Sequence, residues 1–179
     1  MTFKDHYNSE IKKKLIAELK LKNVMEAPRI LKIVLNVGVG EAVSNKNVLD
    51  KVVEQLTTIS GQKPVVTRAR KSVSAFKIRK GLPIGVKVTL RNERMFSFLE
   101  KLVRIVIPRL RDFRGIQEKN VDQNGNLNLG FTEQTIFPEI DFDKVDKIRG
   151  LEVTIVTNAR DHQRGKKLFE LLGVPFKKS

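Results

Sequence analysis

The sequence predicts an α+β fold in which helices pack on one face of a largely antiparallel sheet, close to a split βαβ plan, and leave the other face open. Three segments, 30–39, 84–91 and 151–157, alternate apolar and polar residues as half-buried strands do. The segments between them repeat apolar residues with a helical period. An apolar content of 40% in 179 residues is enough for one core. We therefore expect a single domain, with an N-terminal helix in 1–28 and the α/β sandwich in 29–179.

The first element is predicted to be an amphipathic helix from Asp5 to Lys22. Lysines fill much of this segment, and its apolar residues recur at every fourth position: Tyr7, Ile11, Leu15 and Leu19. The stripe is narrow and has no Trp or Phe anchor, which favours packing on the domain over binding to a membrane surface. Pro28 disfavours a helix through Ala27, so a break is expected before the first strand.

The predicted strands each have one apolar face, which we expect in the core, and one small or polar face. The core set is Ile33, Leu35, Val37, Ile84, Val86, Val88, Leu90, Leu151, Val153 and Ile155. The outward set is Lys32, Val34, Asn36, Gly38, Gly85, Lys87, Thr89, Arg91, Glu152, Thr154 and Val156. Asn and Gly are unfavourable in strands, so Asn36 and Gly38 need another reason to be there, such as a partner that approaches the backbone closely.

Three further helices are predicted from capping residues and apolar periodicity. Ser44 or Asn45 is expected to cap the first, which ends at Gly61 and buries Leu49, Val52, Val53, Leu56 and Ile59. Asn92 is expected to cap the second, which ends at Pro108. Asn158 is expected to cap the last, which ends at the Gly-Val-Pro turn 173–175.

The stretch 63–80 is the most basic part of the chain. It contains seven cations and no carboxylate: Lys63, Arg68, Arg70, Lys71, Lys77, Arg79 and Lys80. A solvated surface is the simpler interpretation, but a block of like charge repels itself and is favoured when a polyanion lies beside it. Most of the stretch forms a loop of about 15 residues without periodicity between two strands, and loops of that length are usually functional. We interpret it as a protruding basic loop that contacts nucleic acid.

Two polar segments follow the third predicted helix. Segment 117–130 contains Asn124-Gly125, a strong hairpin-turn signal. Segment 131–146, interpreted as an acidic hairpin, has a net charge of −4 from five carboxylates and one lysine. A solvated loop and a docking site for a basic protein are both consistent with it. Its spacing matches no calcium loop, and no His or Cys accompanies it, so neither a metal site nor acid/base catalysis is predicted.

The formal charge of +15 and pI near 10.2 are typical of proteins that bind phosphates. An anionic membrane surface and acidic proteins are the alternatives. With no cysteine, no secretory signal and no apolar run of about 18 residues, the sequence predicts a soluble cytosolic protein. His6 and His162 are the only histidines, and no nucleophile, P-loop or zinc motif accompanies them. An enzyme acting on a phosphorylated substrate and a free DNA- or RNA-binding regulator remain weaker hypotheses than a structural RNA-binding protein.

The outward strand positions carry no aromatic residue, which argues against a base-stacking surface and favours folded, largely double-helical RNA recognised through phosphates and shape. Several long motifs also resemble those of the ribosomal protein L5 family, the 5S-rRNA-binding proteins of the large subunit. They are IVLNVGVGEA at 33–42, LTTISGQKPVVTRARKS at 56–72, SVSAFKIRKGLPIGVKVTLR at 72–91, RLRDFRG at 109–115 and NARDHQRGKKLFELLGVPF at 158–176. The motifs occur in order along the whole chain, and its length is similar to that of a bacterial member.

The resemblance implies a structural constituent of the large ribosomal subunit, without enzymatic activity or cofactor, that acts in translation beside large-subunit rRNA and other proteins of the central protuberance. It implies that 5S rRNA binds to Asn36, Gly38, Gln62, Lys63, Thr67, Arg68, Lys87, Thr89 and Arg91. It implies that the following loop contacts P-site tRNA through Arg70, Lys71, Ser74, Lys77, Arg79 and Lys80. It also implies a bridge to small-subunit protein S13, which is basic, through Arg111, Asp112, Arg114, Glu133, Glu139, Asp141 and Asp143.

Overall fold

The computed structural model describes residues 3–43, 45, 47–110, 114–142 and 145–177. The chain divides into two compact units, each built from separate stretches of sequence. The first unit comprises Met1–Ile33, Arg91–Leu129 and Thr154–Ser179, and the second comprises Val34–Leu90 and Gly130–Val153. The expectation of a single domain stays a prediction.

The strands form a five-stranded antiparallel sheet in the order β2-β3-β1-β5-β4, which confirms the predicted α+β class. The bounds are Ile30–Gly38 for β1, Val65–Arg68 for β2, Pro83–Leu90 for β3, Leu127–Phe131 for β4 and Leu151–Thr157 for β5. β4 was expected only as part of a polar hairpin region. Its apolar residues nevertheless alternate with Asn128 and Gly130, and its burial alternates accordingly.

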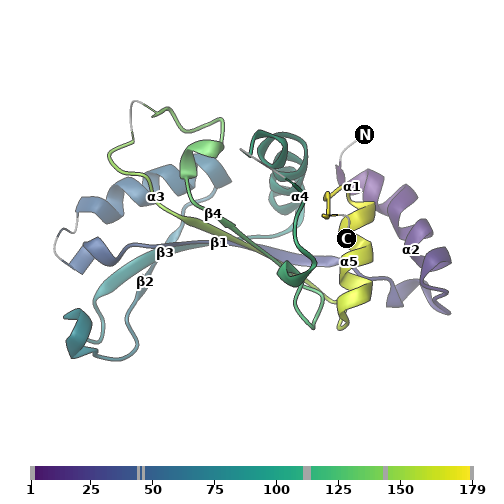
Figure 1. Cartoon of the computed structure of the whole chain (residues 1–179), viewed down its shortest axis with the longest axis horizontal. Helices are drawn as coiled ribbons and strands as arrows, with labels where there is room; N and C mark the ends of the chain where they lie inside the picture. The colour runs from purple at the N-terminus through teal and green to yellow at the C-terminus, as the bar shows by residue number, and fades with distance from the viewer. Residues whose placement is uncertain (1–2, 44, 46, 111–113, 143–144, 178–179) are drawn as a thin grey trace. The chain divides into compact units, whose positions relative to one another are not determined.

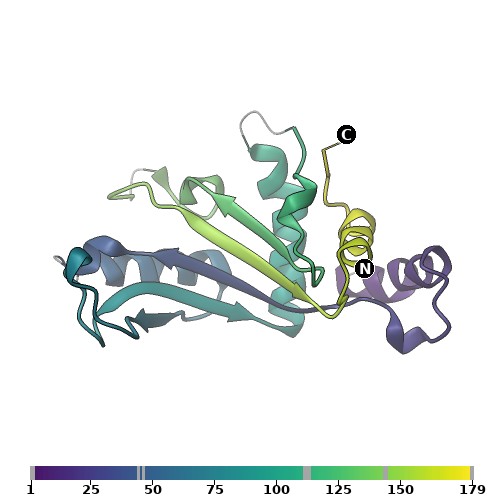
Figure 2. The ribbon, with the colours of Figure 1, turned by 60° about the horizontal axis from the view of Figure 1, so that its bottom comes forward.

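In the second unit, the helix α3, Asn47–Ser60, packs along the strands, as Figure 2 shows. Its buried residues recur with the predicted helical period and include Val52, Leu56 and Ile59. The helix ends at Gly61, whose φ of +66° is the left-handed conformation expected there. Ser44 lies outside the described residues, and the Asn45 side chain accepts a hydrogen bond from the backbone N–H of Asn47 at 3.1 Å.

Gly85 lies on the predicted outward face, but the expectation that it is exposed is wrong, because the residue is buried. A Cβ atom at Gly85 would lie 2.8 Å from Thr67 Oγ1 and 2.9 Å from the carbonyl oxygen of Val37. Alternation assigned its face correctly, since β2 and β3 pair Thr67 with Gly85 in antiparallel register. The Thr67 side chain lies over the glycine and covers it, which alternation within one strand does not reveal.

In the first unit, the N-terminal helix consists of α1 (Phe3–His6), a π-helical turn (Tyr7–Ile11) and α2 (Lys12–Glu18). The predicted stripe is buried at Tyr7, Ile11 and Leu15, and the Tyr7 hydroxyl donates a 2.8 Å hydrogen bond to the carbonyl of Pro28. Burial raises the pKa of Tyr7 to about 12. The helix ends before the predicted Lys22, because Lys20 has a left-handed φ of +49°.

Two predicted helix caps in the first unit are wrong. The helix α4, Asn92–Lys101, has Arg91 at its N-cap without a side-chain bond, while Asn92 has a φ of +50°. It continues as a π-helical turn at Leu102–Val106 and a 3₁₀ turn at Ile107–Arg109, which contains Pro108. The helix α5, His162–Leu171, is capped by Asp161, whose carboxylate accepts from the backbone N–H of Arg164 at 3.1 Å.

Asn158 joins the chain to a distant segment instead of capping α5. Its side-chain oxygen accepts from the backbone N–H of Arg29 at 2.6 Å, and its own N–H donates to the carbonyl of Arg29 at 3.1 Å. The sequence signal was ambiguous, because Asp161 lies only three residues further on and is an equally good cap.

The predicted turn at Asn124-Gly125 is confirmed in the first unit. The Asp122 carboxylate accepts from the backbone N–H groups of Asn124 and Asn126 at 2.9 and 2.8 Å, and Gly125 has a φ of +79°. The turn packs closely on α5, since a Cβ at Gly165 would lie 2.6 Å from the carbonyl oxygen of Gly125. Throughout the described parts of the chain, no helix combines the length and apolar character that a membrane span requires.

Candidate nucleic-acid interface

The second unit exposes one face of β1, β2 and β3 opposite the buried face that α3 covers. Asn36 and Thr89 are half-buried on this face, whereas Gly38 and Lys87 are exposed. The register of β2 and β3 pairs Val65 with Lys87 and Thr67 with Gly85, so these side chains share the face. We call the face formed by Asn36, Gly38, Thr67, Lys87 and Thr89 the open face.

Other predicted RNA-binding residues lie at the edges of this face. Gln62 donates from its amide to the carbonyl of Thr89 at 3.2 Å, so it holds the end of α3 against the strand. Lys63 is exposed, and Arg68 is exposed while donating to the carbonyl of Gly81 at 3.1 Å. Arg91 belongs to the first unit, so the structure does not group it with the others.

Gly38 has open space where a side chain would be. A Cβ atom built on it meets nothing within 4 Å, and its backbone is not in the left-handed region. Nothing in the fold of the chain therefore requires glycine at this position. A strand glycine without an internal reason is consistent with a partner whose backbone approaches the sheet closely.

The cations of the basic stretch form no ion pair with any carboxylate that the structure describes. Within the part of the chain that the structure describes, no carboxylate lies within 4.0 Å of the charged nitrogens of the seven cations in 63–80 or of Lys87. The one outward carboxylate on the second unit's strands is Glu152, on β5, on the other side of β1 from β3. A polyanion is therefore attracted to the β2 and β3 side of the face.

The loop between β2 and β3 is an ordered hairpin, which corrects the expectation of an irregular segment. The backbones of Val73 and Ile78 exchange two hydrogen bonds of 2.8 and 3.1 Å, and Lys77 closes the tip with a φ of +54°. Nearer the strands, Ala69 bonds to Leu82 and Gly81, and Ser72 Oγ accepts from the backbone N–H of Lys80 at 3.0 Å. Figure 1 shows this hairpin projecting beyond the ends of β2 and β3. We call residues 69–82 the basic hairpin.

The basic hairpin presents all the cations predicted for its contact site. Arg70, Lys71, Lys77, Arg79, Lys80 and also Ser74 are exposed. Analysis of the sequence missed one residue among them, Phe76, whose side chain is 72% exposed at the tip. The sequence did show an aromatic residue within a cationic loop. No pattern in the sequence, however, indicated whether its side chain would be buried in the core or exposed.

The described part of the acidic segment 131–146 does not form a hairpin. After the end of β4 it contains a 3₁₀ turn at Gln134–Ile136 and further turns, with backbone bonds from Ile140 to Phe137 and from Val145 to Phe142. The buried side chain of Gln134 holds the segment in place. Its amide nitrogen donates a hydrogen bond to the carbonyl of Lys147 at 2.7 Å, and its amide oxygen accepts one from the backbone N–H of Arg149 at 2.5 Å. These bonds replace the strand ladder that a hairpin would have supplied.

The Arg149 side chain also holds the acidic segment in place. Its side chain is only 5% exposed and binds Asp146 in a bidentate pair at 2.9 and 3.0 Å. The hydrogen bond from Arg149 lowers the pKa of Asp146 to about 2, and Lys51 contributes from 3.8 Å. Lys147 and Glu41 form a further ion pair at 2.8 Å. Together these contacts hold the segment against α3 and the turn after β1.

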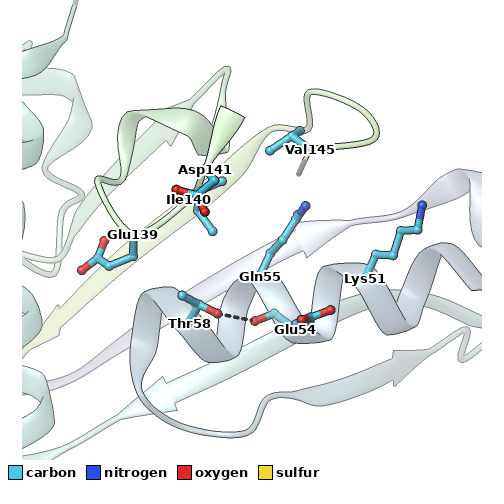
Figure 3. Close-up of a pocket in the computed structure, with 8 residues that line it drawn as sticks. All are labelled: Lys51, Glu54, Gln55, Thr58, Glu139, Ile140, Asp141 and Val145. Atoms are coloured by element: carbon cyan, nitrogen blue, oxygen red, sulfur yellow. Dashed lines mark hydrogen bonds between the residues drawn. The ribbon is translucent and has the colours of Figure 1, made fainter. Parts of the chain in front are cut away.

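A pocket of about 300 Å³ lies between α3 and the acidic segment (Figure 3). The helix contributes Lys51, Glu54, Gln55 and Thr58, and the segment contributes Glu139, Ile140, Asp141 and Val145. Among the described residues that line it, three carboxylates accompany one lysine, which gives this described lining a net negative charge on a chain of charge +15. The arrangement suits a cationic protein side chain better than a phosphate.

The residues predicted for a protein bridge are only partly brought together. Glu139 and Asp141 line the pocket, and Glu133 is half-buried and accepts from Thr135 Oγ1 at 3.3 Å. Arg114 is exposed in the first unit, so it is not grouped with them. Arg111, Asp112 and Asp143 lie outside the described residues. Among the residues that are described, no group of three or more His, Asp or Glu is arranged to hold a metal ion.

Comparison with known proteins gives consistent matches over nearly the whole chain. Residues 23–79 match the family model described as "Ribosomal protein L5", and residues 83–176 match the model for the C-terminus of the same ribosomal family. A protein of Roseiflexus castenholzii named "Large ribosomal subunit protein uL5" is 55% identical over 174 residues, which cover 97% of each chain. A protein of the same name from Syntrophotalea carbinolica is 53% identical over 175 residues, covering 98% of this chain and 95% of its own.

Proposed function

The chain belongs to the ribosomal protein L5 family, and from that premise we propose that it binds 5S rRNA through the open face of its second unit. As a family member it is a structural, non-enzymatic constituent of the large ribosomal subunit, in the cytoplasm, and acts in translation. The proposal concerns the partners within that role. 5S rRNA is held at the open face and seated in the central protuberance, beside large-subunit rRNA and neighbouring proteins.

The observation that carries the proposal is the combination of uncompensated cations with open space at Gly38. Lys63, Arg68 and Lys87 surround a strand face that offers hydroxyl and amide groups and no aromatic ring. Such a face suits the phosphates and 2′-hydroxyls of a folded RNA, and bare backbone at Gly38 allows the RNA chain to approach. Arg91, which stands at the start of α4, is proposed as a further contact.

The basic hairpin is proposed to contact P-site tRNA. Its cations are exposed on a projection that is ordered by its own hydrogen bonds, so binding requires little ordering of the backbone. Contacts made mainly by charge suit successive tRNAs of different sequence, because phosphate contacts carry no sequence information.

The acidic segment is proposed to contact small-subunit protein S13. The negatively charged lining around Glu139 and Asp141 would complement a basic protein, and the hydrogen bonds of Gln134 and Arg149 restrain the segment that carries it. Arg111, Asp112, Arg114, Glu133 and Asp143 are proposed as further contacts of this bridge.

The experiment that tests 5S binding compares 5S rRNA with duplex DNA of equal length in filter-binding titrations at several salt concentrations. We expect 5S rRNA to be preferred in moderate salt, with affinity falling by about two decades between roughly 50 and 200 mM if about four phosphates are neutralised, one for each cation assigned to 5S rRNA. Equal affinity for both nucleic acids contradicts the proposal.

Variants separate the open face from the hairpin. Asn36→Ala and Lys87→Gln are expected to weaken 5S binding, and Lys87→Gln also to reduce the salt slope by about one. Lys77→Ala and Arg79→Ala are the matched controls in the hairpin and should change 5S binding little. If the hairpin variants cause the larger loss, the assignment of 5S rRNA to the open face is wrong.

A further inference from the structure

We propose that Phe76 is a stacking site for an unpaired nucleobase, so that the basic hairpin recognises an unstacked base as well as phosphates. This inference rests on the proposed contact of the hairpin with tRNA and adds a chemical class of ligand to it. Among the aromatic residues that the structure describes, only Phe76 and Phe142 are exposed, at 72% and 70%. The other described rings are buried or half-buried.

Backbone hydrogen bonds hold the tip that carries the ring. The bridge between Val73 and Ile78 closes a four-residue loop, in which Ser74–Phe76 form a 3₁₀ turn. The N–H of Lys77 donates to the carbonyl of Ser74 at 3.0 Å, and its left-handed φ ends the turn. These hydrogen bonds favour one conformation of the backbone that carries Phe76, which lowers the entropic cost of stacking.

The charge around the ring selects nucleic acid over an apolar partner. Lys71, Lys77, Arg79 and Lys80 are exposed on the same hairpin, and the described residues provide no carboxylate partner for them. Sites for single-stranded nucleic acid combine such cations with aromatic rings on which bases stack. A protein partner for the ring would have to cover these cations, which is unfavourable unless that partner is strongly acidic.

Phe76 supplies the kind of contact that the strand faces lack. The prediction that outward strand positions carry no aromatic ring holds for every described strand, so base stacking is absent from the open face. The hairpin tip is where the second unit offers an exposed ring among cations. A base that is already unpaired can reach it without the cost of opening a helix.

The test introduces tryptophan at position 76 and follows its fluorescence. The natural sequence has no Trp, so Phe76→Trp gives a single reporter at the tip. Phe142→Trp is the matched control, because Phe142 is equally exposed but lies in the acidic segment. We expect a short single-stranded oligo(A) and unmodified tRNA to quench Trp at 76 strongly and at 142 hardly at all. A blunt RNA duplex should quench neither.

Affinity measurements with Phe76→Leu complete the test, because leucine keeps apolar volume but cannot stack. Loss of stacking is expected to weaken oligo(A) and tRNA binding by about 5- to 150-fold, with less than about twofold change for the duplex. Lys77→Gln should weaken all three RNAs. Equal binding of Phe76→Leu and wild type to oligo(A), or an equal loss on the duplex, overturns the inference.

The same titrations distinguish failure of the inference from failure of the proposed function. If oligo(A) binding depends on Phe76 but tRNA does not bind, the stacking site stands and the tRNA contact is wrong. If tRNA binds through Lys77 but independently of the ring, the tRNA contact stands and the stacking site is wrong.

Discussion

Two glycines on the same sheet face are expected to respond to alanine in opposite ways. At Gly38 the added methyl group meets nothing within 4 Å, and the backbone conformation is one that alanine adopts. Gly38→Ala is therefore expected to raise the free energy of unfolding by about 0.4–1 kcal/mol, because the unfolded chain loses freedom. For a chain of this length, that corresponds to a rise in Tm of about 1–4 °C.

At Gly85 the same methyl group has no room. It would lie 2.8 Å from Thr67 Oγ1 and 2.9 Å from the carbonyl oxygen of Val37, and the second atom belongs to the backbone of a neighbouring strand. Gly85→Ala is expected to lower the free energy of unfolding by about 1–3 kcal/mol, since the strands must shift to accept it. The corresponding fall in Tm is about 2–12 °C.

RNA binding separates the two variants in a second way. If 5S rRNA lies against the bare backbone at Gly38, Gly38→Ala should lose about tenfold in affinity, equivalent to about 1.4 kcal/mol, while its Tm rises. Thermal unfolding by circular dichroism and filter binding on the same preparations provide both measurements. Unchanged affinity of Gly38→Ala would refute the close approach of RNA, and unchanged Tm of Gly85→Ala would refute the packing argument.

Two further predictions concern stability. The folded-state pKa of Asp146 is lowered to about 2. The contribution of this carboxylate to the free energy of unfolding is therefore complete above its ordinary pKa near 3.8 and is lost as the pH falls through about 2. Because the carboxylate is partly exposed, we expect it to contribute about 1 kcal/mol to the free energy of unfolding. In urea unfolding, this contribution should be lost between about pH 5 and 2, and the loss should be absent in Asp146→Asn. A pH dependence identical to wild type in that variant would contradict this. Gly165→Ala forces its methyl group into the Gly125 turn and should lower the Tm by at least about 2 °C. An unchanged Tm would show that the turn moves freely.

Alternation and charge in the sequence predicted the main architecture correctly. The core positions in β1, β3 and β5 are buried with few exceptions, and the cations of 63–80 are exposed. These features follow from the two-residue period of a strand and from the high cost of burying charge, both of which act on neighbouring residues. Helix caps were less predictable, because Asn158 and Asp161 are equivalent candidates in sequence and only the contact with Arg29 distinguished them.

The candidate site could be only partly predicted. Gln62 stays a predicted RNA contact, and its amide also donates to the carbonyl of Thr89, a residue far along the chain. The acidic segment was expected to be a hairpin, whereas Gln134 and Arg149 hold its described part by side-chain hydrogen bonds that leave no periodic pattern. Contacts of this kind join residues that are distant in sequence, so no local signal predicts them.

The sequence by itself determined the fold class, the buried faces, the excess positive charge and the resemblance to the L5 family. The tertiary structure decided that residues 69–82 form a hydrogen-bonded hairpin, that Phe76 is uncovered, and that Gly38 is open while Gly85 is enclosed. The reason is physical. Periodicity records which side of an element meets the core, whereas the space beside one atom depends on residues brought there from elsewhere in the chain.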